Sequence, residues 1–313
     1  MGDSVQFTVV IPLYNKEKHI IRAIKSVLQQ THNDFEIIVV NDGSIDSSVE
    51  QVKKIGDSKI KLIQQKNAGV SAARNNGINN ANFNYIAFLD ADDTWEPDFL
   101  ETINKLINSY PMAGAYATSY RFVKENGKVV PARDSIFFNG KTGGIVDYFK
   151  ESLKTPLISA SSVVIPKSVF ENLGGFPIGI TRGEDLDMWC RIALNYEVVF
   201  SNSICANYFQ NAENRACNTE REHTKSLMSY AEKILIREKE KSSSLPDFFE
   251  EYMIKIIIHN ATYLSSINRH KEARKLLYKY RYTKYNKKNL IKSYVLNYKL
   301  MYSIKKTLKN KLK

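Results

Sequence analysis

The chain has 313 residues, of which 43% are hydrophobic and 25% charged, and its formal net charge is +12. This composition excludes disordered, collagen-like and coiled-coil chains, and the length suits one large domain or one domain with an appendage. The positive charge lies at one end, because residues 269–313 hold 16 Lys or Arg and one acid, Glu272, whereas the residues before them have a net charge of −3. A near-neutral body therefore carries a strongly basic tail, and each needs its own functional explanation.

The first hundred residues alternate between strand and helix patterns. Phe7–Leu13 is an apolar run typical of a buried strand, and Glu17–Leu28 has apolar residues at helical spacing. This alternation predicts an α/β fold with a mainly parallel sheet, helices on both faces, and ligands bound beyond the carboxyl ends of the strands. Further strands are predicted at Phe35–Val40, Ile60–Gln64 and Tyr85–Leu89, and further helices at 47–55, 70–79 and 97–108.

The rest of the chain combines shorter strands with a helical end. A hairpin is predicted about Asn126-Gly127, and we expect a first domain over residues 1–218, with halves 1–110 and 111–218, followed by an all-α extension over 219–313 that is basic from 269. The predicted elements are strands at Tyr116–Lys124, Lys128–Val130, Ser162–Ile165, Val198–Phe200 and Ala206–Gln210, and helices at 184–195, 221–241, 247–266, 270–281 and 288–311.

Targeting signals and cysteines give an expectation for location. No basic segment followed by a long apolar run opens the sequence, so we expect no signal peptide. The apolar runs, such as Phe35–Val40, are far shorter than the roughly 20 residues of a membrane-spanning helix. Three irregularly spaced cysteines favour reduced thiols. We expect a cytoplasmic protein, free or peripheral on the inner face of the cytoplasmic membrane.

Polar residues follow each of the first four predicted strands, and in a parallel sheet these four loops share one edge. Turn and helix-capping chemistry explains any one loop. It does not explain three carboxylates within four residues, because neighbouring negative charges repel one another. The loops are Pro12-Leu13-Tyr14-Asn15, Asn41-Asp42-Gly43-Ser44, Lys66-Asn67-Ala68-Gly69 and Asp90-Ala91-Asp92-Asp93.

A divalent cation relieves the conflict among Asp90, Asp92 and Asp93. Carboxylate oxygens suit Mg²⁺ or Mn²⁺, which commonly complete their coordination with water and substrate phosphates. Neither GxGxxG nor GxxxxGK[ST] occurs in the chain, so a dinucleotide fingerprint and a P-loop are both excluded. The sequence therefore predicts a site for a metal-bound nucleotide sugar.

Several longer motifs occur in order over about residues 5–210. As a set they resemble the inverting glycosyltransferases of family 2, which have the GT-A fold, of the kind that builds bacterial surface polysaccharides. The resemblance does not extend to the last hundred residues. The motifs are VVIPLYN (9–15), SVLQQT (26–31), DFEIIVVNDGSIDSS (34–48), NAGVSAARNNGI (67–78), YIAFLDADDTWEPDFL (85–100), GGF (174–176) and GEDLDMWCRI (183–192).

The resemblance implies roles for individual residues. It implies a nucleotide-sugar-binding half over 1–110 and an acceptor-side half over 111–218, with a saccharide or a lipid-linked saccharide as acceptor. Asp185 would be the general base, and Asp92 would ligate Mn²⁺ or Mg²⁺ on the diphosphate. Glu184 and Trp189 would lie on the acceptor side. The nucleotide-sugar, a UDP-sugar by resemblance, would be contacted by Pro12, Tyr14, Asn15, Asp42 (base ring), Asn67, Arg74, Asp90 (ribose or sugar), Ala91 and Asp92.

One departure from the family pattern concerns the metal. Many relatives carry a histidine shortly after the strand that follows the base helix, where it completes the metal site. Residues 208–215 contain none here, and the next histidine is His223. Three arrangements remain open: Gln210, Asn211 or Glu213 replaces the histidine, His223 reaches in from the next helix, or the ion is held by Asp92, diphosphate and water alone.

The basic tail has two interpretations. Residues 288–313 place apolar residues on one helical stripe with lysines on its flanks, which is typical of a helix lying on an anionic membrane surface. The alternative is a helix packed on the protein with its lysines in water. Because family 2 enzymes commonly act on lipid-linked acceptors, the resemblance favours the membrane.

Two other function classes compete with a glycosyltransferase. A nucleic-acid-binding protein explains the basic tail but not the aspartate cluster, and no recognised binding motif is present, so we expect no nucleic-acid partner. A sugar nucleotidyltransferase shares the metal and the nucleotide. It would need a glycine- and arginine-rich loop after the first strand, which is missing.

Overall fold

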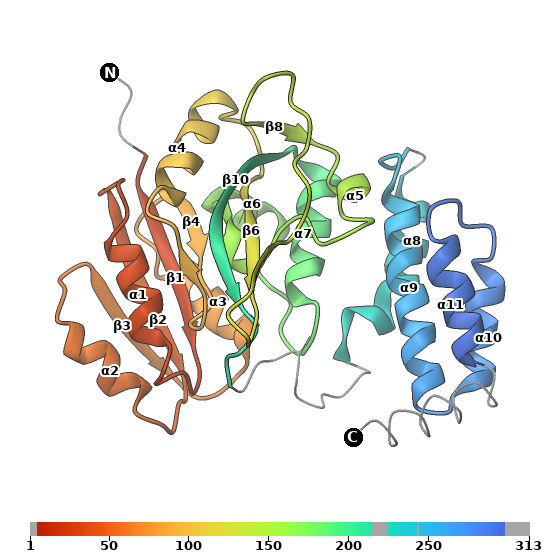
Figure 1. Ribbon diagram of the computed structural model, residues 1–313, viewed down its shortest axis with the longest axis horizontal. Coiled ribbons are helices and arrows are strands. Elements are labelled where there is room, and N and C mark those ends of the chain that lie inside the picture. Colours follow the sequence, from red (N-terminus) through yellow and green to blue (C-terminus); the bar gives the residue numbers. More distant parts are fainter. Residues whose placement is uncertain (1–4, 214–224, 243, 298–313) are drawn as a thin grey trace. The chain divides into compact units, whose positions relative to one another are not determined.

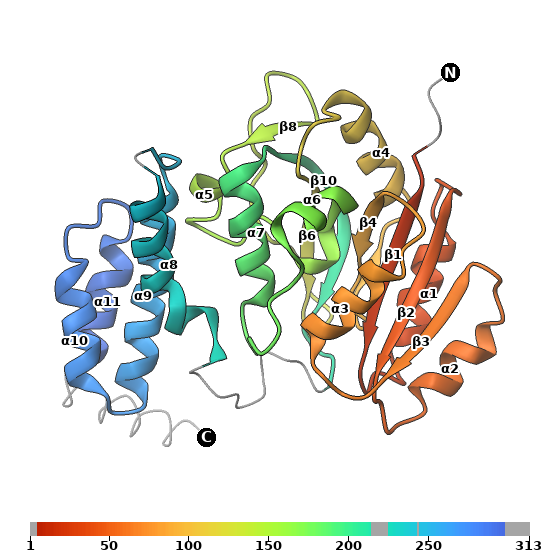
Figure 2. The same cartoon turned by 180° about the vertical axis from the view of Figure 1, so that it is seen from behind.

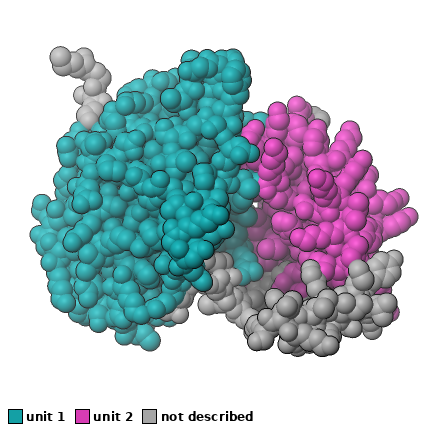
Figure 3. All heavy atoms as spheres, in the orientation of Figure 1, with its two compact units in different colours: residues 1–148, 155–221 teal, residues 149–154, 222–313 magenta. Residues whose placement is uncertain are grey.

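The computed structural model describes residues 5–213, 225–242 and 244–297. The chain forms two compact units, coloured separately in Figure 3. Unit 1 comprises residues 1–148 and 155–221, and unit 2 comprises residues 149–154 and 222–313. The short helix α5 (Tyr148–Glu151) spans the first of these boundaries along the chain.

Unit 1 is built on a mixed sheet with the strand order β3-β2-β1-β4-β9-β6-β10-β5, in which β7 also pairs with β6 and β8 with β10. Strands β3, β2, β1 and β4 are parallel to one another, so their carboxyl ends lie at one edge. β9 is antiparallel to both β4 and β6, and β10 runs parallel to β6. The strands are β1 (Phe7–Leu13), β2 (Phe35–Asp42), β3 (Ile60–Gln65), β4 (Tyr85–Phe88), β5 (Thr94–Trp95), β6 (Ala115–Val123), β7 (Val129–Pro131), β8 (Gly143–Val146), β9 (Val163–Pro166) and β10 (Val198–Phe209).

Helices cover both faces of this sheet, as the sequence predicts. Helices α1, α2 and α4 lie on the face seen in Figure 1, and α3, α6 and α7 lie on the face seen in Figure 2. A 3₁₀ turn, η1, precedes β9. The bounds are α1 (Ile20–Leu28), α2 (Ser48–Ile55), α3 (Val70–Asn79), α4 (Phe99–Ser109), η1 (Ala160–Ser162), α6 (Lys167–Leu173) and α7 (Glu184–Asn195).

Helices pack against β1 on both faces of the sheet. Alternate residues of β1, from Phe7 to Leu13, are fully buried among apolar residues of α1 and α4. Val10 points to the other face, where α3 approaches closely because Gly77 has no side chain; a Cβ there would lie 2.3 Å from a Val10 methyl carbon. This contact sets the position of α3, the helix that carries Arg74.

Unit 2 is a group of helices packed around α9. The side of α11 that carries Leu290 and Ser293 is buried, and the Thr262 hydroxyl of α9 donates a 2.9 Å hydrogen bond to Ser293. The described residues contain no helix that is long and apolar enough to cross a membrane. The helices are α8 (Leu227–Lys241), α9 (Phe249–Ser266), α10 (His270–Lys279) and α11 (Lys287–Asn297).

The predicted α/β fold with a helical C-terminal region is confirmed, with changes in detail. The hairpin at Asn126-Gly127 forms, with Gly127 at φ 75°. The two strands predicted at Val198–Phe200 and Ala206–Gln210 are one strand, β10, whose pairing with β6 shifts register on either side of Ile204. β8 and α6 were not predicted. Residues 221–224 and 298–311 of the predicted terminal helices lie outside the described residues.

Candidate active site

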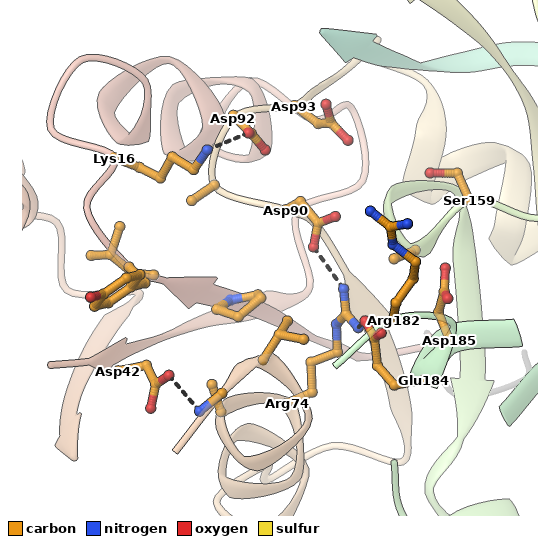
Figure 4. A pocket seen from close by; sticks show the side chains of 18 of the residues that line it. Lys16, Asp42, Arg74, Asp90, Asp92, Asp93, Ser159, Arg182, Glu184 and Asp185 are labelled. Atoms are coloured by element: carbon orange, nitrogen blue, oxygen red, sulfur yellow. Dashed lines mark hydrogen bonds and ion pairs between the residues drawn. The ribbon is translucent and has the colours of Figure 1, made fainter. Parts of the chain in front are cut away.

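A cavity of about 450 Å³ opens at the carboxyl edge of the parallel strands (Figure 4). The loops after β1, β2, β3 and β4 line one part of it, and the first turn of α7 lines another. The structure thus brings together the expected site residues except Asn15 and Trp189. The expected residues that line the cavity are Pro12, Tyr14, Asp42, Asn67, Arg74, Asp90, Ala91, Asp92, Glu184 and Asp185.

Arg74 joins the two parts of the cavity wall. Its side chain is only 3% exposed, and its guanidinium donates to Asp90 Oδ1 at 2.9 Å and to Glu184 Oε1 at 3.0 Å. The ring of Phe176 lies beneath the guanidinium, 5.2 Å away. Burial lowers the pKa of Arg74, but the charges of Asp90 and Glu184 outweigh it and raise that pKa overall. The guanidinium therefore remains charged and fixes the distance between β4 and α7.

Asp185 is a half-buried carboxylate in the first turn of α7. Burial raises its pKa, the charge of Glu184 raises it further, and Arg74 lowers it, with a result of about 7. A helix N-terminus by itself favours the ionised form of a carboxylate. The desolvation of the carboxylate and its acidic neighbour outweigh the helix dipole, so this group gains and loses its proton near neutral pH.

The three carboxylates after β4 have different surroundings. Asp90 is paired with Arg74, and burial nevertheless raises its pKa. Asp93 is buried and accepts hydrogen bonds from the Ser161 hydroxyl at 2.6 Å and from the Phe209 backbone N–H at 3.0 Å; burial raises its pKa well above the usual range. Asp92 lies between them and contacts the Lys16 ammonium at 2.7 Å. Each of the three carboxylates therefore has a different partner, and that of Asp92 is an ammonium.

Asp42 and Asn67 hold two strand-end loops together. The Asp42 carboxylate accepts hydrogen bonds from the backbone N–H groups of Ala68 and Gly69, at 2.8 and 2.9 Å, and from the Gln65 side chain at 2.8 Å. The Asn67 side-chain amide donates to the Asp42 carbonyl at 2.9 Å. These bonds shape the start of α3 and leave the Asp42 carboxylate at the cavity wall.

Asn15 and Trp189 do not line this cavity. Asn15 has φ 50°, and its side-chain oxygen accepts from the Ile45 N–H at 2.9 Å, so it ties the loop after β1 to the loop after β2. Trp189 is 1% exposed and packs edge-on against Phe176, with the ring centroids 5.9 Å apart. It belongs to the core beneath α7.

The polar residues of the cavity wall that sequence reasoning missed include Lys16, Ser159 and Arg182. Lys16 directly follows the Tyr14-Asn15 pair and Arg182 precedes the Gly183-Glu184 pair, so proximity to the motifs was the available signal. Ser159 is not adjacent to any of these motifs. It lies at the N-terminus of η1, and the fold brings it to the cavity.

The residues present fit a divalent ion only with help from a substrate. The described part of the chain contains no group of three His, Cys, Asp or Glu side chains placed to hold a metal. Glu213, one proposed replacement for the missing histidine, has its carboxylate 2.7 Å from the Lys18 ammonium. His223 lies outside the described residues. An ion at Asp92 would thus take most of its ligands from diphosphate and water.

Comparisons with known proteins show the family of the chain. The family model described as "Glycosyl transferase family 2" matches residues 8–174. An uncharacterized glycosyltransferase of Rickettsia conorii is 39% identical over 195 residues, which cover 61% of this chain and 30% of that protein. Glycosyltransferase GlyA of Streptococcus pneumoniae is 43% identical over 124 residues, covering 39% of this chain and 18% of GlyA. The chain spans less than a third of the length of these curated relatives.

A solved structure shares the fold. TarS of S. aureus, residues 1–349 in complex with UDP-GlcNAc, superposes with a TM-score of 0.64 at 21% identity, covering 84% of this chain and 73% of that one. The family model and this superposition identify the sheet of unit 1 as a GT-A fold.

We predict that Arg74→Gln destabilises the protein by about 2–3 kcal/mol, because it leaves Asp90 and Glu184 facing each other without a cation in a poorly hydrated site. Lys105→Gln is the control. Lys105 pairs at 3.4 Å with Glu101 in an exposed position on α4, where the loss of an ion pair costs at most about 1 kcal/mol. Chemical denaturation measures both free energies of unfolding, and equal losses would contradict the role of Arg74.

Proposed function

The chain belongs to glycosyltransferase family 2, and on this premise we propose that unit 1 is an inverting glycosyltransferase domain with a nucleotide-diphospho-sugar as donor. The observation that carries the proposal is the cavity in which Asp92 and Asp185 line the same space at the carboxyl ends of the strands. The acceptor is a hydroxyl of a saccharide or of a lipid-linked saccharide in cell-surface polysaccharide synthesis. Chondroitin synthase of Escherichia coli, 27% identical over 210 residues, supports that setting by its name.

We infer a uridine nucleotide as the donor's leaving group. TarS, which shares the fold, has been solved with UDP-GlcNAc and with UDP. A carboxylate has about four lone-pair sites, and Asp42 uses three of them for the loop before α3. The remaining site can accept the N3–H of uracil. Pro12, Tyr14 and Asn67 would border the nucleotide, and Asn15 would act by ordering the loop.

The reaction needs a base on one side of the sugar and a stabilised leaving group on the other. Asp185 takes the proton of the acceptor hydroxyl as the hydroxyl oxygen bonds to the anomeric carbon. The bond from that carbon to the diphosphate oxygen breaks with its electron pair on the diphosphate, and a single displacement inverts the anomeric configuration. Arg74 holds Asp90 and Glu184 in place around the sugar, and Trp189 supports α7 from the core.

Asp92 is the residue that would hold Mn²⁺ or Mg²⁺ together with the diphosphate. A bound cation supplies charge stabilisation to the departing diphosphate. Asp93 has a structural role, because its hydrogen bonds with Ser161 and Phe209 hold the Asp90–Asp93 turn against β10.

Two alternatives remain distinguishable by product. A sugar nucleotidyltransferase would release pyrophosphate from a nucleoside triphosphate as it joins the nucleotide to a sugar 1-phosphate, whereas a glycosyltransferase releases a nucleoside diphosphate from the nucleotide sugar. A nucleic-acid-binding protein would bind oligonucleotides without turnover, in a salt-dependent manner.

We predict that Asp185→Asn lowers the rate of donor turnover by about 10²–10⁴-fold, the usual contribution of a general base, and leaves donor binding intact. Asp187→Asn is a matched control, because Asp187 lies in the same turn of α7 but pairs with Arg191 at 2.7 Å. Turnover is followed as UDP release from a panel of UDP-sugars, and binding as a thermal shift. Near-normal turnover by Asp185→Asn would remove Asp185 from the base role.

The pH dependence tests the same assignment. The base must be ionised to accept a proton, and the pKa of Asp185 is raised to about 7. Turnover should therefore rise with pH and reach half its maximum near pH 7, whereas a carboxylate of ordinary pKa would give a flat profile from pH 6 to 8. A flat kcat/KM profile over that range would show that Asp185 is not the titrating base.

We also propose that the basic end of unit 2 attaches the protein to an anionic membrane surface. Residues 298–313 of the segment 288–313 lie outside the described residues. In the described part, Leu290 packs inward in α11, while Lys287, Lys288 and Lys292 are exposed. The support for attachment to a membrane therefore comes from the exposed lysines and not from an apolar stripe.

Replacing Lys287, Lys288 and Lys292 with Gln should weaken binding to phosphatidylserine vesicles by about tenfold or more, since each lysine near such a surface contributes on the order of 1 kcal/mol. The control replaces Lys53, Lys54 and Lys61, three exposed lysines of unit 1. Co-sedimentation measures both, and unchanged binding of the first variant, or equal loss in the second, would contradict attachment through unit 2.

A further inference from the structure

Lys16 is a buried cation at the edge of the cavity that the reaction described above does not use. It follows Asn15 in the loop after β1, and its side chain is 10% exposed. The ammonium donates to Asp92 Oδ2 at 2.7 Å and to the backbone carbonyl of Glu213 at 2.7 Å. The Lys16 backbone N–H donates to the Ser48 hydroxyl at 2.9 Å, which holds the start of the side chain in place. Lys16 therefore joins the loop after β4 to the segment after β10.

The Lys16 ammonium faces the carboxylate that a divalent cation would use. Asp90 pairs with Arg74, and Asp93 accepts hydrogen bonds from Ser161 and Phe209, whereas the partner of Asp92 is Lys16. The ammonium neutralises Asp92, and it repels a second cation brought against the same oxygen. In Figure 4 the Lys16 side chain extends across the loop to Asp92. The Asp92 carboxylate thus has a counter-ion within the protein.

A nucleotide diphosphate changes this balance of charge. Its oxygens are strong acceptors for an ammonium, which has three donors on a flexible stem. If the ammonium turns from Asp92 to a diphosphate oxygen, the Asp92 carboxylate is left without its counter-ion and can ligate a cation. Binding of the diphosphate would then favour binding of a divalent cation at Asp92.

We propose that Lys16 couples metal binding to nucleotide binding: it blocks Asp92 in the empty protein and transfers to the diphosphate when donor and cation bind together. The inference rests on the proposed role of Asp92 in the donor site. It makes Lys16 a positioning residue, which acts on the cation through Asp92. Because coupling between two ligands is reciprocal, the cation must also strengthen nucleotide binding by the same factor.

A purely structural role for Lys16 leads to a different expectation. A tether between Asp92 and Glu213 would affect the stability of the fold, but it would leave the ratio of cation affinities with and without nucleotide unchanged. That ratio is therefore the quantity to measure.

The test uses Mn²⁺ and UDP as probes, with free Mn²⁺ measured by electron paramagnetic resonance in the presence and absence of UDP. Lys16→Met should bind Mn²⁺ alone about tenfold more tightly than the wild type, because an unblocked carboxylate attracts the ion. The gain in Mn²⁺ affinity on adding UDP should shrink correspondingly. Lys18→Met is the matched control, since Lys18 is 62% exposed and pairs with the Glu213 side chain. It removes the same charge nearby and should behave like the wild type.

Lys16→Gln serves as a second variant if Lys16→Met does not fold, because its amide can still donate to the Glu213 carbonyl. Unchanged affinity for Mn²⁺ alone, or an unchanged gain from UDP, would overturn the inference, as would an equal change in Lys18→Met. Absence of Mn²⁺ binding to every form, even with UDP, would also overturn it. In that last case the proposed function would still stand if UDP release continued to depend on Asp185.

Discussion

The site depends on one buried guanidinium. A charge removed from water is tolerated when it is paired and hydrogen-bonded, and Arg74 meets that condition through Asp90 at 2.9 Å and Glu184 at 3.0 Å. Arg74 lies on α3, Asp90 follows β4 and Glu184 opens α7, so the two ion pairs join three elements that are distant in the sequence. The N-terminus of α7 is thereby fixed beside the ends of the parallel strands. Asp185 takes its position from this arrangement, while burial and the charge of Glu184 raise its pKa against the opposing effect of Arg74.

In the loops after β1 and β4, some polar side chains hold the structure together, and others line the cavity. After β4, Asp93 holds the turn to the rest of the sheet while Asp92 keeps a carboxylate at the cavity. After β1, Asn15 connects two loops, and the next residue, Lys16, reaches the cavity. Neighbouring residues in each loop thus have opposite tasks, because the pocket needs rigid walls and accessible charges at the same place.

Local pattern predicted the parallel half of the fold well, since the predicted strand Phe7–Leu13 and helix 70–79 match β1 and α3. It also predicted which strand ends meet, because the order of elements determines that edge. It could not predict contacts between distant residues: Arg74 and Glu184 are 110 positions apart. The burial of Trp189 on α7 likewise depends on neighbours that no local pattern reveals. The same is true of β10, which continues through the polar residues 201–203 because it pairs with β6.

The central claim is that this cavity transfers a sugar from a nucleoside diphosphate by a single displacement. Proton NMR of UDP-sugar turnover tests it most directly, with water as acceptor and spectra recorded before the released sugar mutarotates. The account predicts that UDP appears together with a sugar whose first-formed anomer has the configuration opposite to that of the donor. Release of UMP together with a sugar 1-phosphate, or of a sugar with the donor's own configuration, would contradict it.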